Sequence, residues 1–191
     1  MTKMTGIIMA GGNSIRMGKD KALINYHGQA QYLQVKNLLA SFCSAVFCSA
    51  KSNKFKDVKT VIDNPELGDV GPIAGLITSL EKFQSPIFVL GVDYPLIGHE
   101  DLNEIYQNHN NAFPATVFFN PESGFLEPLI GIYEPSILPI LKTSLNSGIS
   151  SIQKILQEHS VQKIIPLNLT KIKSIDLPDD AINIMEGKHE L

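Results

Sequence analysis

The chain has 191 residues, of which 43% are hydrophobic and 18% charged, and its formal net charge is −3. These values are typical of a globular chain with one sizeable core, so we expect a single domain over residues 1–191. The acidic balance disfavours a nucleic-acid partner, and no apolar run reaches the roughly 18 residues that a membrane span needs.

The N-terminus does not resemble a signal peptide, because MTKMT leads directly into an apolar segment typical of a strand. Cys43 and Cys48 have no His or Cys cluster around them, which disfavours a zinc site. We therefore expect a cytoplasmic protein with reduced cysteines.

Short apolar segments alternate with amphipathic segments along the chain. We expect strands over residues 6–10, 44–50, 59–63, 86–93, 114–119, 126–134 and 161–167. We expect helices over residues 35–42, 71–83, 99–109, 137–145, 151–159 and 177–187. This alternation is typical of an α/β fold with a mostly parallel sheet, to which a hairpin around 120–124 adds antiparallel content.

A glycine-rich, basic stretch, MAGGNSIRMGKDK (residues 9–21), follows the first predicted strand. Gly11 and Gly12 permit a sharp turn that exposes backbone N–H groups, and such groups bind phosphate. The spacing fits neither the P-loop nor the dinucleotide-binding fingerprint. Because Arg16 and Lys21 add two cations, we predict a polyphosphate-binding loop rather than a plain turn.

Polar residues end three further strands, at the edge where sheets of this class bind ligands. A carboxylate among apolar residues is costly without a cation, and Mg²⁺ binds one or two carboxylates together with substrate phosphates. We therefore predict that Asp93 is a magnesium ligand rather than a turn aspartate. Asp63 either forms an Asx turn or contacts the base or ribose of a nucleotide. Gly71, Pro72 and Gly75, which open a predicted helix, reflect either plain packing or space for a flat nucleobase.

These motifs, in this order, resemble the molybdenum cofactor guanylyltransferase family of nucleotidyltransferases. MAGGNSIRMGKDKAL resembles the family signature L-A-G-G-x-S-x-R-M-G-x-D-K, GPIAGL its second motif and GVDYPLI its metal motif. EPLIGIYEPSILPIL resembles the late strand and helix, and SIDLPDDA the closing N-x-N-T-P-E-D-L stretch. The resemblance covers nearly the whole chain and implies a Rossmann-like, three-layer nucleotidyltransferase fold.

The resemblance also implies an activity. Members of this family use Mg²⁺ and transfer GMP from GTP to molybdopterin or Mo-molybdopterin, releasing pyrophosphate. Partner proteins that insert the cofactor, and the molybdoenzymes that receive it, are further expectations from the family.

The same resemblance implies residue roles. The catalytic residues would be Arg16, Lys21 and Asp93, with Asp93 as the metal ligand. The nucleotide would contact Met9, Ala10, Gly11, Gly12, Lys21, Ser49, Asp63 and Asp93. Ser49 stands where the family often has Asn beside the base or ribose.

Three alternatives follow from departures in the closing motif. Ser174 and Asp176 replace two asparagines that are usual in guanylyltransferases, and the sister molybdopterin cytidylyltransferases often carry Asp there. Use of CTP, or of a sugar-phosphate acceptor, is therefore an alternative, although Gly11, Gly12 and GPIAG favour the guanylyl branch. An alternative of another class is a non-catalytic nucleotide-binding partner protein. Asp176 itself would contact the metal, cap a helix or contact the acceptor.

Overall fold

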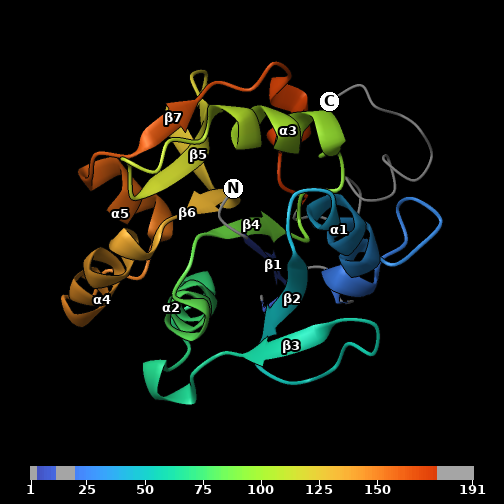
Figure 1. The fold of residues 1–191 in the computed structure, drawn as a ribbon, viewed down its shortest axis with the longest axis horizontal. Coiled ribbons are helices and arrows are strands. Elements are labelled where there is room, and N and C mark those ends of the chain that lie inside the picture. Colours follow the sequence, from blue (N-terminus) through green and yellow to red (C-terminus); the bar gives the residue numbers. More distant parts are fainter. Residues whose placement is uncertain (1–3, 12–19, 176–191) are drawn as a thin grey trace.

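A seven-stranded mixed sheet forms the centre of the computed structural model, which describes residues 4–11 and 20–175 (Figure 1). The strands are β1 (Thr5–Met9), β2 (Ala45–Ala50), β3 (Lys59–Ile62), β4 (Ile87–Gly91), β5 (Ala115–Asn120), β6 (Phe125–Tyr133) and β7 (Gln162–Ile164). Their order is β3-β2-β1-β4-β6-β5-β7. Only β6 runs antiparallel to its neighbours β4 and β5, which confirms the mostly parallel α/β fold.

Helices cover both faces of the sheet and make a three-layer arrangement (Figure 1). The α-helices of the described part are α1 (Gln31–Ala40), α2 (Pro72–Phe83), α3 (His99–Asn108), α4 (Leu138–Asn146) and α5 (Ile152–Glu158). Helices α1 and α3 pack on one face of the sheet, and α2, α4 and α5 pack on the other. None of these helices has the length and apolarity that crossing a membrane requires.

Strands β1 and β4 are continuous apolar runs because helices bury both of their faces. Ile7 packs into the apolar cluster on the α2 side, whereas Ile8 packs into the cluster on the α1 side. Because β1 and β4 pair in parallel, their ends lie side by side in the middle of the sheet, where Met9 pairs with Gly91.

Several predicted elements differ from or lie beyond the structure. The helix predicted over 35–42 is α1 and begins four residues earlier, at Gln31, and the strand predicted over 86–93 is β4 and ends at Gly91. The strand predicted over 161–167 is shorter, since β7 pairs with β5 only from Gln162 to Ile164, and Pro166 has no N–H to extend the ladder. The helix predicted over 177–187 lies outside the described residues, as does Asp176.

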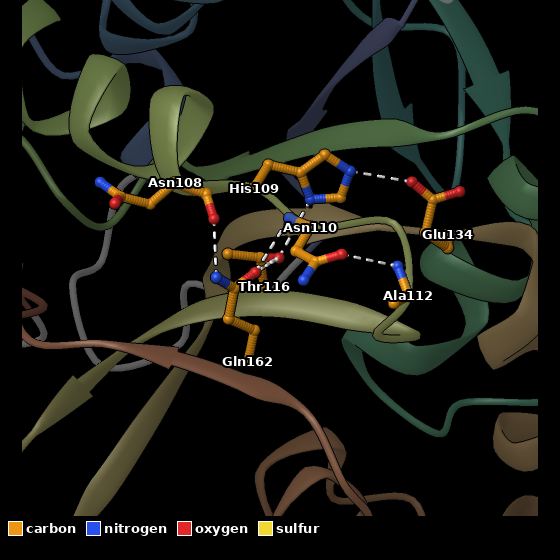
Figure 2. A network of polar contacts seen from close by, with 7 residues as sticks. All are labelled: Asn108, His109, Asn110, Ala112, Thr116, Glu134 and Gln162. Carbon is orange, nitrogen blue, oxygen red and sulfur yellow. Dashed lines mark hydrogen bonds and ion pairs between the residues drawn. The ribbon is translucent and has the colours of Figure 1, made fainter.

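A polar network fastens the edge strand β7 to the rest of the fold (Figure 2). The amide of Gln162 donates to the carbonyl of Asn108 at 2.6 Å. Its Oε1 accepts from the backbone N–H of Asn110 and from the hydroxyl of Thr116, each at 2.9 Å. One side chain of β7 therefore holds both the end of α3 and the strand β5.

His109 extends this network to the end of β6 (Figure 2). Its Nδ1 lies 3.0 Å from Thr116 Oγ1 and its Nε2 lies 2.9 Å from Glu134 Oε1. By the strand register, these contacts lie at the end of the sheet opposite to Asp93. The network therefore stabilises the scaffold without facing the candidate site.

Candidate active site

A cavity of about 550 Å³ opens where the parallel strands β1, β3 and β4 end. The chain continues from β1 to β2 on one side and returns to β4 on the other, so this is the topological switch point of the sheet. The volume is within the usual range for small-molecule sites. The cavity is therefore the place where the fold itself predicts a ligand.

Most of the residues predicted from the sequence meet in this cavity. Its lining includes Met9, Ala10, Gly11, Lys21, Asp63 and Asp93. Gly12 and Arg16 lie outside the described residues. Ser49 is 1% exposed and lies behind Asp63, so its contact with the cavity is made through that carboxylate.

Ser49 holds the Asp63 carboxylate in place. The Ser49 hydroxyl donates a hydrogen bond of 2.6 Å to Asp63 Oδ1. Burial raises the pKa of Asp63, while the bond from Ser49 and the charge of Lys51 act in the opposite direction. A Cβ at Gly75 would lie 2.1 Å from Ser49 Oγ, so the space beside this glycine is taken by Ser49. Gly75 thus packs against Ser49, whereas Gly71 and Pro72 at the start of the same helix line the cavity.

Asn64, rather than Asp63, caps the turn that follows β3. Its side chain accepts from the backbone N–H of Glu66 at 3.0 Å, which is the Asx-type bond expected at this position. The Asp63 carboxylate is therefore not engaged in the turn. It is oriented by Ser49 and contributes to the cavity wall.

Asp93 lies on the turn that follows β4, beside the end of β1. The N–H of Val92 donates to the carbonyl of Met9 at 3.2 Å, which joins this turn to the end of β1. A Cβ at Gly91 would lie 2.3 Å from Asp93 Oδ1. Glycine at position 91 therefore allows the carboxylate to fold back over the end of its own strand.

Two weak acids near Asp93 respond to its negative charge. Burial, and secondly the charge of Asp93, raise the pKa of Tyr26 to about 12. Burial also raises the pKa of Glu127; the hydrogen bond from Tyr94 opposes this shift and the charge of Asp93 adds to it. Both neighbours of Asp93 are thus partly buried, and a cation there would be attracted by the negative charge of Asp93.

The donor set at Asp93 fits a magnesium ion that arrives with a nucleotide. Within residues 4–11 and 20–175, no three His, Cys, Asp or Glu side chains gather to hold a metal ion. Mg²⁺ commonly keeps several waters and combines one or two carboxylates with substrate phosphates. Asp93 offers one carboxylate, and Lys21 and Gly11 in the same lining are suited to contact substrate phosphates.

Several cavity residues were not predicted from the sequence. Lys51 directly follows β2 and forms an ion pair of 2.8 Å with Asp69. The rule that ligands bind at strand ends, which predicted Ser49, could also have indicated Lys51. Leu129 has no comparable signal. It reaches the wall because the β5–β6 register shifts between Val117, which pairs with Gly131, and Phe118, which pairs with Glu127.

The first departure from the family's closing motif lies beside Asp93. The backbone N–H of Ile175 donates to the Asp93 carbonyl at 2.8 Å, and Ser174 precedes Ile175. Residues of this late segment therefore adjoin the turn that carries Asp93.

Solved structures of nucleotidyltransferases share this fold. Molybdopterin-guanine dinucleotide biosynthesis protein A from Archaeoglobus fulgidus matches with a TM-score of 0.78 and 22% identity, over 98% of this chain and 100% of that chain. The 2-C-methyl-D-erythritol 4-phosphate cytidylyltransferase from Thermus thermophilus matches with a TM-score of 0.70 and 11% identity, over 98% of this chain and 99% of that one.

A curated relative is closer in sequence. A molybdenum cofactor biosynthesis bifunctional protein from Synechocystis is 34% identical over 185 residues, which cover 94% of this chain and 53% of the relative. The chain therefore spans about half the length of that protein.

The family assignment rests on a match over most of the chain. The model of the MobA-like NTP transferase domain matches residues 6–163, a range that contains Lys21, Asp63 and Asp93. Together with the shared fold and the curated relative, this match shows that the chain belongs to the MobA-like NTP transferase family.

Proposed function

We propose that this protein is a molybdenum cofactor guanylyltransferase, which transfers GMP from GTP to the phosphate of molybdopterin or Mo-molybdopterin and releases pyrophosphate. One observation supports this proposal most strongly. Four residues line one cavity at the switch point of a MobA-like fold: Gly11, Lys21, Asp63 and Asp93. A backbone turn and a cation suit phosphates, and one carboxylate suits a metal ion.

Asp63 supports guanine rather than cytosine as the base. The pairing edge of guanine carries two adjacent N–H donors, and both oxygens of a carboxylate accept from such an edge. The edge of cytosine carries one amino donor beside two acceptors, which a carboxylate would repel. Ser49 uses one acceptor position of Asp63 Oδ1, and the acceptor positions that remain on the two oxygens suit a two-donor edge better.

The reaction is a displacement at phosphorus. An oxygen of the acceptor phosphate bonds to the α-phosphorus of GTP, and the bond to the bridging oxygen breaks, so that pyrophosphate leaves with the electron pair. Lys21 and the backbone at Gly11 neutralise charge on the departing phosphates. Asp93 would hold Mg²⁺, which when bound supplies positive charge beside the triphosphate. The acceptor is already ionised, so no general base is needed.

Pyrophosphate release with GTP, CTP and ATP, each with and without molybdopterin, tests this proposal. We expect release that requires molybdopterin and is fastest with GTP. Faster release with CTP would favour the cytidylyl alternative, and binding without release would favour a non-catalytic nucleotide-binding protein. Asp63→Asn is the matched variant: the amide keeps one acceptor oxygen but replaces the other by an NH2 donor, which faces an N–H of guanine, so the preference for GTP should fall.

A further inference from the structure

Tyr94 and Glu127 form a buried contact next to Asp93. Tyr94 follows Asp93 directly and is 5% exposed, and its hydroxyl donates to Glu127 Oε2 at 2.9 Å. One edge of its ring lies 3.2 Å from where a Cβ of Gly91 would stand, so the ring packs against the end of β4. A phenol buried in this way is costly unless its hydroxyl has a partner, and Glu127 is that partner.

The turn that carries Asp93 is fastened on other sides as well. Nε2 of His27 donates to the carbonyl of Pro95 at 2.7 Å. The backbone N–H of Ile175 donates to the carbonyl of Asp93 itself at 2.8 Å. Segments that are far apart in the sequence therefore hold the backbone at the candidate metal ligand and two residues after it.

An apolar cluster adds to these polar contacts. Ile175 is 2% exposed and packs with Ile24 and Tyr26 from the segment of His27 and with Leu96, which follows Pro95. The backbone of the turn is thus held by hydrogen bonds and by packing. The Tyr94–Glu127 bond differs from the others because it fixes the side chain next to Asp93 and links it to the central strand β6.

We propose that Tyr94 and Glu127 are positioning residues, whose hydrogen bond holds the turn so that Asp93 faces the phosphates and their metal ion. This inference rests on the proposed function. Glu127 acts here as a hydrogen-bond acceptor and not as a second metal ligand. The β5–β6 register shift at Phe118 and Glu127 places its carboxylate under Tyr94.

Four variants separate the hydrogen bond from the charge of Glu127. Tyr94→Phe removes the donor, Glu127→Ala removes the acceptor, and Glu127→Gln keeps an acceptor while removing the charge. The measured quantity is the Mg²⁺ concentration for half-maximal transfer. We expect Tyr94→Phe and Glu127→Ala each to raise it about tenfold, as is typical of residues that orient a metal ligand. The fourth variant combines Tyr94→Phe with Glu127→Ala, and its Mg²⁺ requirement should be no higher than that of either single variant.

Glu127→Gln is the decisive comparison, because the glutamine oxygen still accepts from the Tyr94 hydroxyl. We expect its Mg²⁺ requirement to stay within about twofold of wild type, since the hydrogen bond is kept. If Glu127→Gln is impaired as strongly as Glu127→Ala, the carboxylate acts by its charge and the proposal is wrong. The proposal is equally wrong if Tyr94→Phe leaves the Mg²⁺ requirement unchanged.

Tyr32→Phe is a matched control. Tyr32 is 7% exposed and donates to Asp57 at 3.0 Å, so this variant loses the same kind of bond away from the cavity lining. We expect a lower melting temperature and an unchanged Mg²⁺ requirement. If Tyr32→Phe raises the Mg²⁺ requirement as much as Tyr94→Phe does, general destabilisation explains both results and the proposal is wrong.

Hydrogen exchange of the backbone amides provides a measurement that does not depend on activity. We expect Tyr94→Phe to accelerate exchange in residues 92–97, with little change in β1 or β4. Unchanged exchange in that turn would overturn the proposal. If the wild-type protein transfers no nucleotide, the proposed function fails, while the exchange data still decide whether the hydrogen bond holds the turn.

Discussion

Gly75 lies so close to Ser49 that a Cβ at position 75 would stand 2.1 Å from the Ser49 hydroxyl oxygen. Ser49 in turn holds Asp63, so a glycine in α2 determines how a carboxylate from the end of β3 is presented to the cavity. Glycine is required here by a close approach of side chains and not by an unusual backbone conformation.

Gly75→Ala should therefore disturb the side of the cavity that Asp63 lines. The new methyl group displaces the Ser49 side chain, and overpacking of this kind costs about 1–3 kcal/mol of folding free energy. We expect a lower melting temperature and weaker GTP binding by calorimetry. Adding Ser49→Ala removes the clashing oxygen and should recover much of the melting temperature. No recovery in the double variant would show that the clash lies elsewhere.

Asp63→Asn should stabilise the folded protein at neutral pH while weakening GTP binding. Burial raises the pKa of Asp63, so the folded state loses stability as the pH rises through that pKa and the carboxyl ionises. Asparagine avoids this cost and still accepts from Ser49. The gain in urea midpoint should shrink as the pH falls toward the ordinary value of 3.8. A gain that is constant from pH 7 to pH 4 would contradict this explanation.

Lys21→Ala should reduce turnover far more than stability. Lys21 is partly exposed at the start of a short 3-10 turn, so little packing is lost, whereas each charge-assisted contact to phosphate is worth about 1.5–3 kcal/mol. We expect the same of Arg16→Ala. The control is Lys142→Ala in α4, which pairs with Glu81 and does not line the cavity. Wild-type kcat/KM in Lys21→Ala would remove this residue from the site.

Asp93→Asn should abolish Mg²⁺-dependent transfer in a protein that still folds. Asparagine has nearly the same shape but lacks the charge that offsets a divalent cation. Circular dichroism and the melting temperature report the fold, and a Mg²⁺ titration of the transfer rate reports the site. Full activity at ordinary Mg²⁺ concentrations would show that another group binds the ion.

Gln162→Ala should destabilise the scaffold and leave the kinetics unchanged. The side chain makes hydrogen bonds to Asn108, Asn110 and Thr116 at the end of the sheet opposite to Asp93 (Figure 2). Loss of this group should cost about 1–3 kcal/mol in urea unfolding. Gln157, an exposed residue of α5, gives the control variant Gln157→Ala. A changed KM for GTP would mean that the network reaches the cavity.

The parts of the site that follow strands were predictable from the sequence. The runs that became β1 and β4 are apolar throughout because both faces are buried, and the rule that ligands bind at strand ends then points to Gly11, Asp63 and Asp93. Lys21 was predictable because a cation next to a glycine-rich turn suits phosphate.

The contacts that depend on the three-dimensional arrangement were not predictable. Tyr94 and Glu127 are 33 positions apart and meet only because β6 returns antiparallel beside β4, with a shifted register against β5. The role of Gly75 depends on how α2 packs over the end of β2. Local sequence patterns do not predict these long-range contacts, because each residue alone fits an ordinary strand, turn or helix.

The most direct test of the central claim follows the α-phosphorus of GTP. The wild-type protein is incubated with α-labelled GTP, molybdopterin and Mg²⁺, and the label in the pterin product is compared with the pyrophosphate released. We predict equal amounts of both, with neither formed when Mg²⁺ or molybdopterin is omitted. Faster incorporation from α-labelled CTP, or pyrophosphate release without label in the pterin, would contradict the assignment as a guanylyltransferase.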